Sequence, residues 1–417
     1  MAHAIEPNGR SSIGFLKFAL AFCLGAMASL LVEHPLRSPT TRPASANAIR
    51  NESPATNKPW GRLDITSIPF ENTEEVFLDH AARLKKPEWV FEGGTPEQLL
   101  AFLRSTDLNE AQQRALLATN TWTIHASNCI VYPSDEIVFA LSSKAREKIY
   151  WALSQCQSNY SQCFPFRFAP NRFEERFANS GLSARTISFV RSLCYTNDGL
   201  LSFCDLDAAS KKLIKSDFDS LIHALYAVPT VRVRLRVGPN DDIERLVKYW
   251  GKGGRERRVR PVLESIARLP GGDSVAVPYL LPGSARLELY TFPDTTRDPA
   301  EARQDCFFTS LNFFNKYADT KFLDKNNTRQ ALQNDYAVIN GPPTYGDLIT
   351  LFDSHGDAVH VAVYIAEDIV FTKNGVNILQ PWVLMRMDDM MSYFPSPEPL
   401  RIVVFRKKEF MQASGTD

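Results

Sequence analysis

The chain has 417 residues, 44% of them apolar and 23% charged, with 47 Lys and Arg balanced by 47 Asp and Glu. A balanced charge gives no global attraction to nucleic acid, so we expect no nucleic-acid partner. The composition is that of a folded globular protein, which excludes a fibrous chain, and the length predicts two or three domains.

Residues 13–32 form an apolar run of nearly membrane length, interrupted by Lys17. From Phe18 onwards the run is shorter than a typical spanning helix and longer than most signal-peptide cores. Three interpretations stay open for residues 1–34: an uncleaved single-pass anchor, a cleaved signal peptide, or a buried helix. We favour the anchor, which makes the membrane a partner. Arg10 and Lys17 then predict folded domains on the periplasmic or extracellular side.

Residues 35–61 are rich in Pro, Ser, Thr, Asn and Ala and have no hydrophobic period, which predicts a disordered tether.

Residues 62–290 predict a mixed α+β domain of unrecognised fold and unknown role. Thr95 starts a helix there, because Pro96 follows it and Gln98 closes a capping box. We also expect helices at 109–117, 142–153, 183–193, 211–226 and 241–250, and strands at 130–132, 136–141 and 230–237.

Two basic stretches lie in this middle region. The strand at 230–237 alternates valine and leucine with three arginines, and residues 252–260 combine glycines with a basic cluster. Either stretch could contact an anion. We favour solvated surfaces, because the second stretch lacks the Gly-Lys-Ser/Thr ending of a phosphate-binding loop.

Whether the cysteines of the middle region form disulfides depends on the compartment in which the protein folds. In an exported protein, Cys156 with Cys163 and Cys194 with Cys204 are close enough in sequence to form disulfides, which leaves Cys129 over. Buried free thiols are the alternative. No Cys or His spacing predicts zinc, so we expect neither a metal nor an organic cofactor.

The C-terminal part carries the pattern most typical of catalysis. Cys306 opens an apolar helix predicted over 306–317, and His360 lies on a strand predicted over 358–366. The thiolate is the reactive form of cysteine, and an imidazole can take its proton and return it to a leaving group. Helix first and antiparallel sheet after is an α+β layout. The other expected elements are a helix at 328–334 and strands at 336–339, 347–352, 369–373 and 401–405.

Residues 291–410 resemble the NlpC-type cell-wall peptidases, a papain-like family of cysteine hydrolases. The matching motifs are Asp305-Cys306, Gly346-Asp347-Leu348 and His360-Val361-Ala362-Val363-Tyr364, in the family's order and at roughly its spacing. The resemblance implies a hydrolase that cleaves amide bonds in peptidoglycan peptides through a Cys-His dyad, and the apolar run at 13–32 would tether it to the membrane. It implies that Cys306 is the nucleophile and His360 the base. Asn374, or alternatively Lys373, would orient the imidazole, and Tyr290 and Asp305 would contact the substrate.

Other interpretations stay open for this region. Phe307 and Phe308 stand where the family has small residues, and such rings could block a cleft. A catalytically inactive NlpC-like binding or assembly module of the cell envelope is therefore the alternative, and acyl transfer to an amine is a third possibility. Cys306 and His360 could also be ordinary core residues, and Asn374 could simply begin a hairpin turn. His355 is the weaker alternative base.

Overall fold

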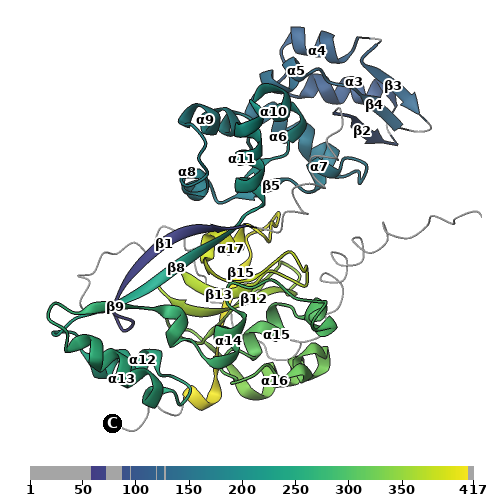
Figure 1. The fold of residues 1–417 in the computed structure, drawn as a ribbon. Helices are drawn as coiled ribbons and strands as arrows, with labels where there is room; N and C mark the ends of the chain where they lie inside the picture. The colour runs from purple at the N-terminus through teal and green to yellow at the C-terminus, as the bar shows by residue number, and fades with distance from the viewer. Residues whose placement is uncertain (1–57, 72–86, 94, 119, 126–127, 412–417) are drawn as a thin grey trace, which may run out of the picture. The chain divides into compact units, whose positions relative to one another are not determined.

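The computed structural model describes residues 58–71, 87–93, 95–118, 120–125 and 128–411. The described chain divides into two compact units. Unit 1 comprises residues 58–66, 231–385 and 398–411, and unit 2 comprises the described residues of 67–230 together with 386–397. Each unit mixes helices with antiparallel sheets, so the α+β prediction is confirmed (Figure 1).

Unit 2 contains two small sheets, each of three strands. One has the order β2-β4-β3 and the other β5-β7-β6. The strands are β2 (Trp89–Glu92), β3 (Trp122–His125), β4 (Asn128–Val131), β5 (Phe166–Phe168), β6 (Tyr195–Asn197) and β7 (Leu200–Phe203). The helices are α3 (Pro96–Ser105), α4 (Glu110–Leu116), α5 (Asp135–Ala140), α6 (Ser143–Ser154), α7 (Tyr160–Cys163), η2 (Pro170–Arg172), α8 (Phe173–Phe177), α9 (Ala184–Ser192), α10 (Leu206–Lys212), α11 (Lys215–Tyr226) and α17 (Met387–Met391).

Side-chain caps set where several of these helices begin. The predicted capping box is present at α3, where Thr95 accepts from the backbone of Gln98 and the Gln98 side chain accepts from the backbone of Thr95. The strand predicted at 136–141 is wrong, because this segment forms α5. The hydroxyl of Ser134 accepts from the backbone N–H of Ile137 and starts that helix, a signal that the apolar run concealed.

The interior of unit 2 holds a buried ionic network around Arg146, whose side chain is fully buried. Its guanidinium donates to the carboxylate of Asp205 at 3.0 Å and to the backbone carbonyls of Val138, Leu141 and Ser192. The hydroxyl of Tyr150 donates to the second oxygen of Asp205 at 2.6 Å. Arg146 thereby links α6 to α5, to the end of α9 and to the residue before α10.

Cys129 is fully buried in the apolar core around Trp89 and Leu103. We expect Cys129→Ala to lower the free energy of unfolding of unit 2 by about 1 kcal/mol, because it removes a packed sulfur atom. Chemical denaturation measures this loss. The alkylation rate of Cys306, in the other unit, should not change. A variant that remains folded and alters Cys306 would contradict a purely structural role for Cys129.

Unit 1 is built on a six-stranded sheet with the order β10-β15-β11-β12-β13-β14. Its strands are β10 (Tyr336–Ile339), β11 (Leu348–Phe352), β12 (Ala358–Ala366), β13 (Ile369–Lys373), β14 (Trp382–Arg386) and β15 (Arg401–Lys407). A three-stranded sheet joins β1 (Arg62–Phe70), β8 (Val228–Val237) and β9 (Asp273–Ala276). The strands predicted in the C-terminal part are confirmed, and β14 is an addition.

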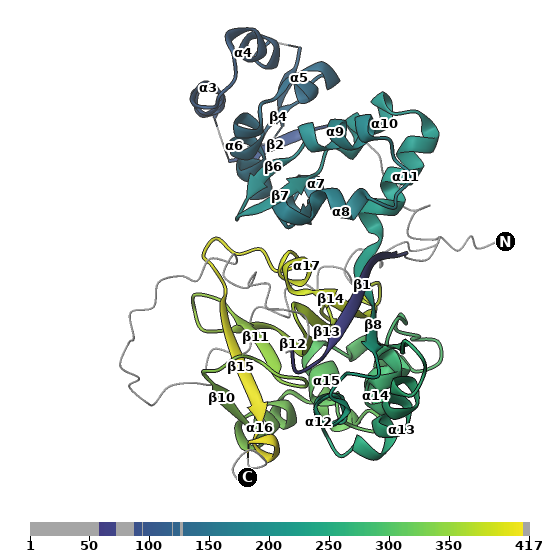
Figure 2. The ribbon, with the colours of Figure 1, turned by 90° about the vertical axis from the view of Figure 1, so that its left-hand side faces the viewer.

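Helices pack around these sheets (Figure 2). They are α12 (Ile243–Trp250), α13 (Glu256–Ala267), η3 (Val277–Leu280), α14 (Gly283–Glu288), η4 (Pro299–Arg303), α15 (Cys306–Leu311), η5 (Thr320–Leu323), α16 (Lys325–Asp335) and η6 (Lys408–Phe410). One apolar core includes Val231 and Leu235 of β8, Trp250 of α12 and Val363 of β12. Residues 231–290 therefore belong with the C-terminal region, and the division of the chain differs from the predicted boundary at 290.

Side chains of both basic stretches form hydrogen bonds or ion pairs within unit 1. In β8, Arg234 bonds to Ser274 and Arg236 pairs with Asp64. In the glycine-rich stretch, Arg255 donates to the backbone carbonyls of Trp250 and Leu280, and Lys252 donates to that of Tyr345 at 2.8 Å. These contacts give Arg255 and Lys252 a structural role.

The structure contradicts the predicted single-pass membrane localisation. Within the part of the chain that the structure describes, no helix combines the length and the apolar character needed to cross a membrane. The apolar run at 13–32 and the tether predicted for 35–61 lie outside the described residues, apart from the last four positions of the tether.

Candidate active site

Cys306 is the first residue of α15 and is 7% exposed. Asp305 precedes it as the N-cap, and its carboxylate accepts from the backbone N–H of Phe308 at 2.8 Å. The helix ends at Leu311, six residues before the predicted end. The buried amide of Asn312 explains the early end, because it donates to the carbonyl of Phe308 and accepts from the N–H of Asp319, so the chain turns.

One face of the six-stranded sheet packs against α15, and we call it the helix face. It presents Val361 and Val363 of β12, Phe371 and Lys373 of β13 and Trp382 of β14. The indole of Trp382 donates to the hydroxyl of Thr309 at 2.9 Å, and the rings of Phe313 and Phe371 lie 5.8 Å apart. Val363 and Phe371 are directly paired across the strands, so their side chains share this face.

His360 points to the opposite side of the sheet, which we call the far face. Successive side chains of a strand alternate between the two faces, and His360 is adjacent to Val361 on β12. The imidazole Nε2 lies 2.9 Å from the hydroxyl of Thr372, which alternates in the same way with Phe371. The Thr372 hydroxyl donates to Asn374 Oδ1 at 3.4 Å, and Asn374 Nδ2 lies 3.6 Å from the sulfur of Met385.

This geometry separates the residues expected to form the catalytic dyad. Cys306 packs against the helix face, whereas His360 projects from the far face, so the sheet lies between the two side chains. The structure does bring His360 and Asn374 into one chain of contacts, but the residue at the imidazole is Thr372. The predicted orienting role of Asn374 is therefore corrected to an indirect one.

The electrostatics of His360 favour a structural residue. The side chain is fully buried, and burial lowers the pKa of His360 from 6.5 to about 3. The imidazole is therefore neutral near neutral pH, and a base with so low a pKa has little tendency to accept a proton from a thiol.

Lys373 is the cationic residue that the fold brings to Cys306. It is fully buried on the helix face, and its ammonium donates to the carbonyls of Gly375 at 2.7 Å and Asn377 at 3.2 Å. Burial lowers the pKa of Lys373 to about 8, and the nearby negative charges of Asp305, Cys306 and Glu288 limit the fall. An amine with this pKa is partly neutral at mildly alkaline pH, and it then accepts a proton.

Two carboxyl groups complete this cluster. Burial raises the pKa of Asp305, against the opposing effects of the backbone N–H groups of Phe308 and Phe307 and the charge of Lys373. Burial and the charge of Glu301 raise the pKa of Glu288 to about 7, although Lys373 opposes the rise. Cys306, Lys373, Asp305 and Glu288, which we call the thiol cluster, form a polar group beside an apolar core. Cys306 and Lys373 are buried, and Asp305 and Glu288 are partly buried. Clusters of such groups with perturbed pKa values are typical of functional sites.

The remaining predicted residues have structural contacts. Tyr290 adopts a left-handed backbone with φ of 62°, and its hydroxyl donates to the carbonyl of Val231 at 2.7 Å. Phe308 is buried in the helix and Phe307 is half-buried beside the same core. The side chain of His355 is 84% exposed in a turn. Of the predicted substrate-contacting pair, Asp305 lies in the thiol cluster.

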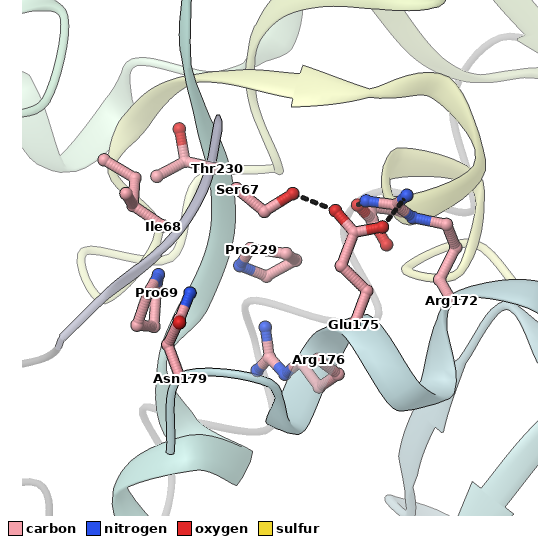
Figure 3. A pocket seen from close by; sticks show the side chains of 10 residues that line it. Ser67, Ile68, Pro69, Arg172, Glu175, Arg176, Asn179, Pro229 and Thr230 are labelled. Atoms are coloured by element: carbon pink, nitrogen blue, oxygen red, sulfur yellow. Dashed lines mark hydrogen bonds and ion pairs between the residues drawn. The ribbon is translucent and has the colours of Figure 1, made fainter. Parts of the chain in front are cut away.

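Unit 2 contains a cavity of about 40 Å³, shown in Figure 3. Its charged groups are engaged with one another: Glu175 accepts from Ser67 and Arg172, and Arg172 also contacts Asp389 at 3.4 Å. Arg176 donates to the backbone carbonyl of Leu225 at 3.1 Å. The space suits a few water molecules. These contacts favour a structural ion-pair network.

No protein-family model, curated protein or solved structure matches this chain. Among the described residues, no group of three or more His, Cys, Asp and Glu side chains could hold a metal ion.

From the sequence, Lys373 is expected only as an alternative partner of the imidazole. The pattern of β13 contains a signal for its true position, because Phe371 and Lys373 are two positions apart and share a face. If the aromatic residue packs against the cysteine helix, the lysine must point the same way.

Proposed function

We propose that unit 1 is a thiol-dependent amide hydrolase in which Cys306 is the nucleophile and Lys373 is its base. One observation carries the proposal: the buried amine of Lys373 lies on the same sheet face as the thiol and within its electrostatic reach. The NlpC-type order of motifs supports peptides of the cell wall as substrates. Lysine serves as the base for a nucleophile on several unrelated folds.

The chemistry follows from the two groups. The neutral amine of Lys373 takes the thiol proton, and the thiolate attacks the carbonyl carbon of the amide. When the tetrahedral intermediate collapses, the C–N bond breaks and the leaving amine takes the proton from the Lys373 ammonium. Water then hydrolyses the thioester and restores the thiol. The raised pKa of Glu288 keeps part of its carboxyl protonated near pH 7, which limits the negative charge that opposes thiolate formation.

A second candidate is the inactive binding or assembly module. The position of His360 on the far face and the small exposure of Cys306 favour it. In this interpretation Lys373 only holds the turn after β13, through its bonds to Gly375 and Asn377. The two candidates differ in whether Cys306 reacts in the folded protein.

Alkylation of Cys306 by iodoacetamide, followed as a function of pH, tests the hydrolase proposal. We expect an apparent pKa below the ~8.5 of a free cysteine, because the ammonium favours the thiolate. Lys373→Met should raise this pKa by about one unit or more, whereas Lys373→Arg should keep it low. Cys306→Ala should abolish release of amines from cell-wall peptides, and Lys373→Met should reduce it roughly 100-fold or more.

The partly exposed thiol of Cys163 provides the internal control in the same samples. Its alkylation should not respond to substitution of Lys373. If native Cys306 reacts no faster than Cys163 at any pH, and no amine is released, the binding module replaces the hydrolase.

A further inference from the structure

Two cysteines of unit 2 meet where α6 and α7 come together. Cys156 lies just after α6 and is 4% exposed, and Cys163 is the last residue of α7 and is partly exposed. The thiol of Cys163 donates to the backbone carbonyls of Ser154 and Cys156, each at 3.3 Å. The sulfur of Cys163 therefore lies against the backbone of the residue that carries the other thiol.

We propose that Cys156 and Cys163 form a redox pair that closes to a disulfide and clamps α7 to the end of α6. Neither cysteine takes part in a disulfide in the structure. Only the short turn and α7 separate them in the sequence, so closing the ring requires a local adjustment of side chains and of this turn. The proposal is independent of any activity at Cys306.

The oxidation requires a disulfide as electron acceptor, such as glutathione disulfide. The partly exposed Cys163 loses its proton to solvent, and its thiolate attacks one glutathione sulfur, which releases a glutathione thiolate. The thiolate of Cys156 then attacks the Cys163 sulfur of the mixed disulfide and releases the second glutathione. Two electrons pass from the cysteines to glutathione disulfide, which leaves as two reduced molecules.

The other cysteines of unit 2 provide the contrast. Cys194 and Cys204 are neighbours in the β6–β7 region, but both are buried. Burial raises the pKa of Cys194 to about 12 and also raises the pKa of Cys204. Burial and the charge of Cys156 raise the pKa of Cys163, but this thiol retains access to solvent. Because exchange needs an accessible thiolate, we expect the 156–163 pair to oxidise first in the folded protein.

Peptide mapping of the full chain distinguishes the two pairs. Trypsin releases Cys156 and Cys163 together in residues 149–167, and Cys194 and Cys204 together in residues 192–211. After incubation of the native protein in a glutathione redox buffer and quenching with N-ethylmaleimide, peptide 149–167 should be unalkylated and lighter by two hydrogen atoms. Peptide 192–211 should carry two alkyl groups. A doubly alkylated or doubly glutathionylated peptide 149–167 would overturn the proposal.

Stability gives a second measurement. Oxidation of the wild-type protein should raise the Tm of unit 2 by roughly 5 °C, because the bridge restricts the unfolded chain. The Cys156→Ser/Cys163→Ser variant should show no such shift in the same buffers. If Cys163→Ser alone leaves the wild-type shift intact, another pair is responsible and the proposal fails.

Discussion

Replacement of Arg146 by methionine is expected to lower the free energy of unfolding of unit 2 by about 3–5 kcal/mol. The guanidinium is fully buried and supplies hydrogen bonds to the Asp205 carboxylate and three carbonyls. Methionine fills similar volume but leaves the buried carboxylate without its cation, and the desolvation cost of that charge is then uncompensated. Urea denaturation monitored by tryptophan fluorescence measures the loss.

Two further variants assign the loss to the unpaired charge. Arg146→Met combined with Asp205→Asn should recover part of the stability, because the buried group is then neutral and still accepts from Tyr150. Arg191→Met removes an exposed partner of Glu174 in the same unit, and it should cost no more than about 1 kcal/mol. A cost below that level for Arg146→Met would show that the network adds little to stability.

Unit 1 is expected to lose stability steeply in acid because of His360. The folded-state pKa of about 3 lies below the ordinary value of 6.5, so the unfolded chain binds a proton that the folded protein excludes. The contribution of neutral His360 to the free energy of unfolding is fully present above pH 6.5, and it decreases as the pH falls towards 3. The loss should reach roughly 3 kcal/mol by about pH 4.5.

The variant His360→Gln isolates this contribution. Glutamine does not titrate and can still bond to the Thr372 hydroxyl, so the difference in unfolding free energy between variant and wild type should shift in the variant's favour as the pH falls from about 7.5 to 4.5. Urea midpoints measured at several pH values give this difference. His355→Gln is the matched control, because that side chain is exposed and its replacement should leave the pH dependence unchanged. Parallel curves for wild type and His360→Gln would contradict a buried neutral imidazole.

Much of the fold could be predicted because its determinants are local. The Thr95 and Ser142 caps and the alternation of β8 are properties of neighbouring residues, and each produces the expected element. The elements that the sequence does not predict correctly are those where two local structures compete. The apolar run at 136–141 suits a strand as well as a helix, and the helix prevails because Ser134 caps it. Asn312 ends α15 through contacts that the apolar pattern does not reveal.

The sequence predicts where the candidate site lies, but it does not predict which side chains of the strands face the cysteine helix. The spacing of Cys306 and His360 correctly indicates a helix and a strand that pack together. Which of two neighbouring residues faces the helix depends on strand pairing and on how the sheet docks, and a shift of one residue exchanges the faces. Val363 and Phe371 lie on the helix face. Because side chains alternate along a strand, Lys373 also lies on the helix face, whereas His360 lies on the far face.

Each unit is built from discontinuous segments of the chain, which limits the truncations that can fold and the order in which the units can fold during synthesis. Residues 386–397 complete unit 2, yet they are synthesised only after residues 231–385 of unit 1. A fragment that begins at residue 291 would lack Val231, Leu235 and Trp250, which share a core with the sheet that carries Lys373. Such a truncation would expose apolar surface and aggregate. For the same reason unit 2 is complete only after residue 397 has been synthesised, and unit 1 only after β15, which lies between β10 and β11 in its sheet. Unit 2 therefore stays incomplete while residues 231–385 of unit 1 are synthesised.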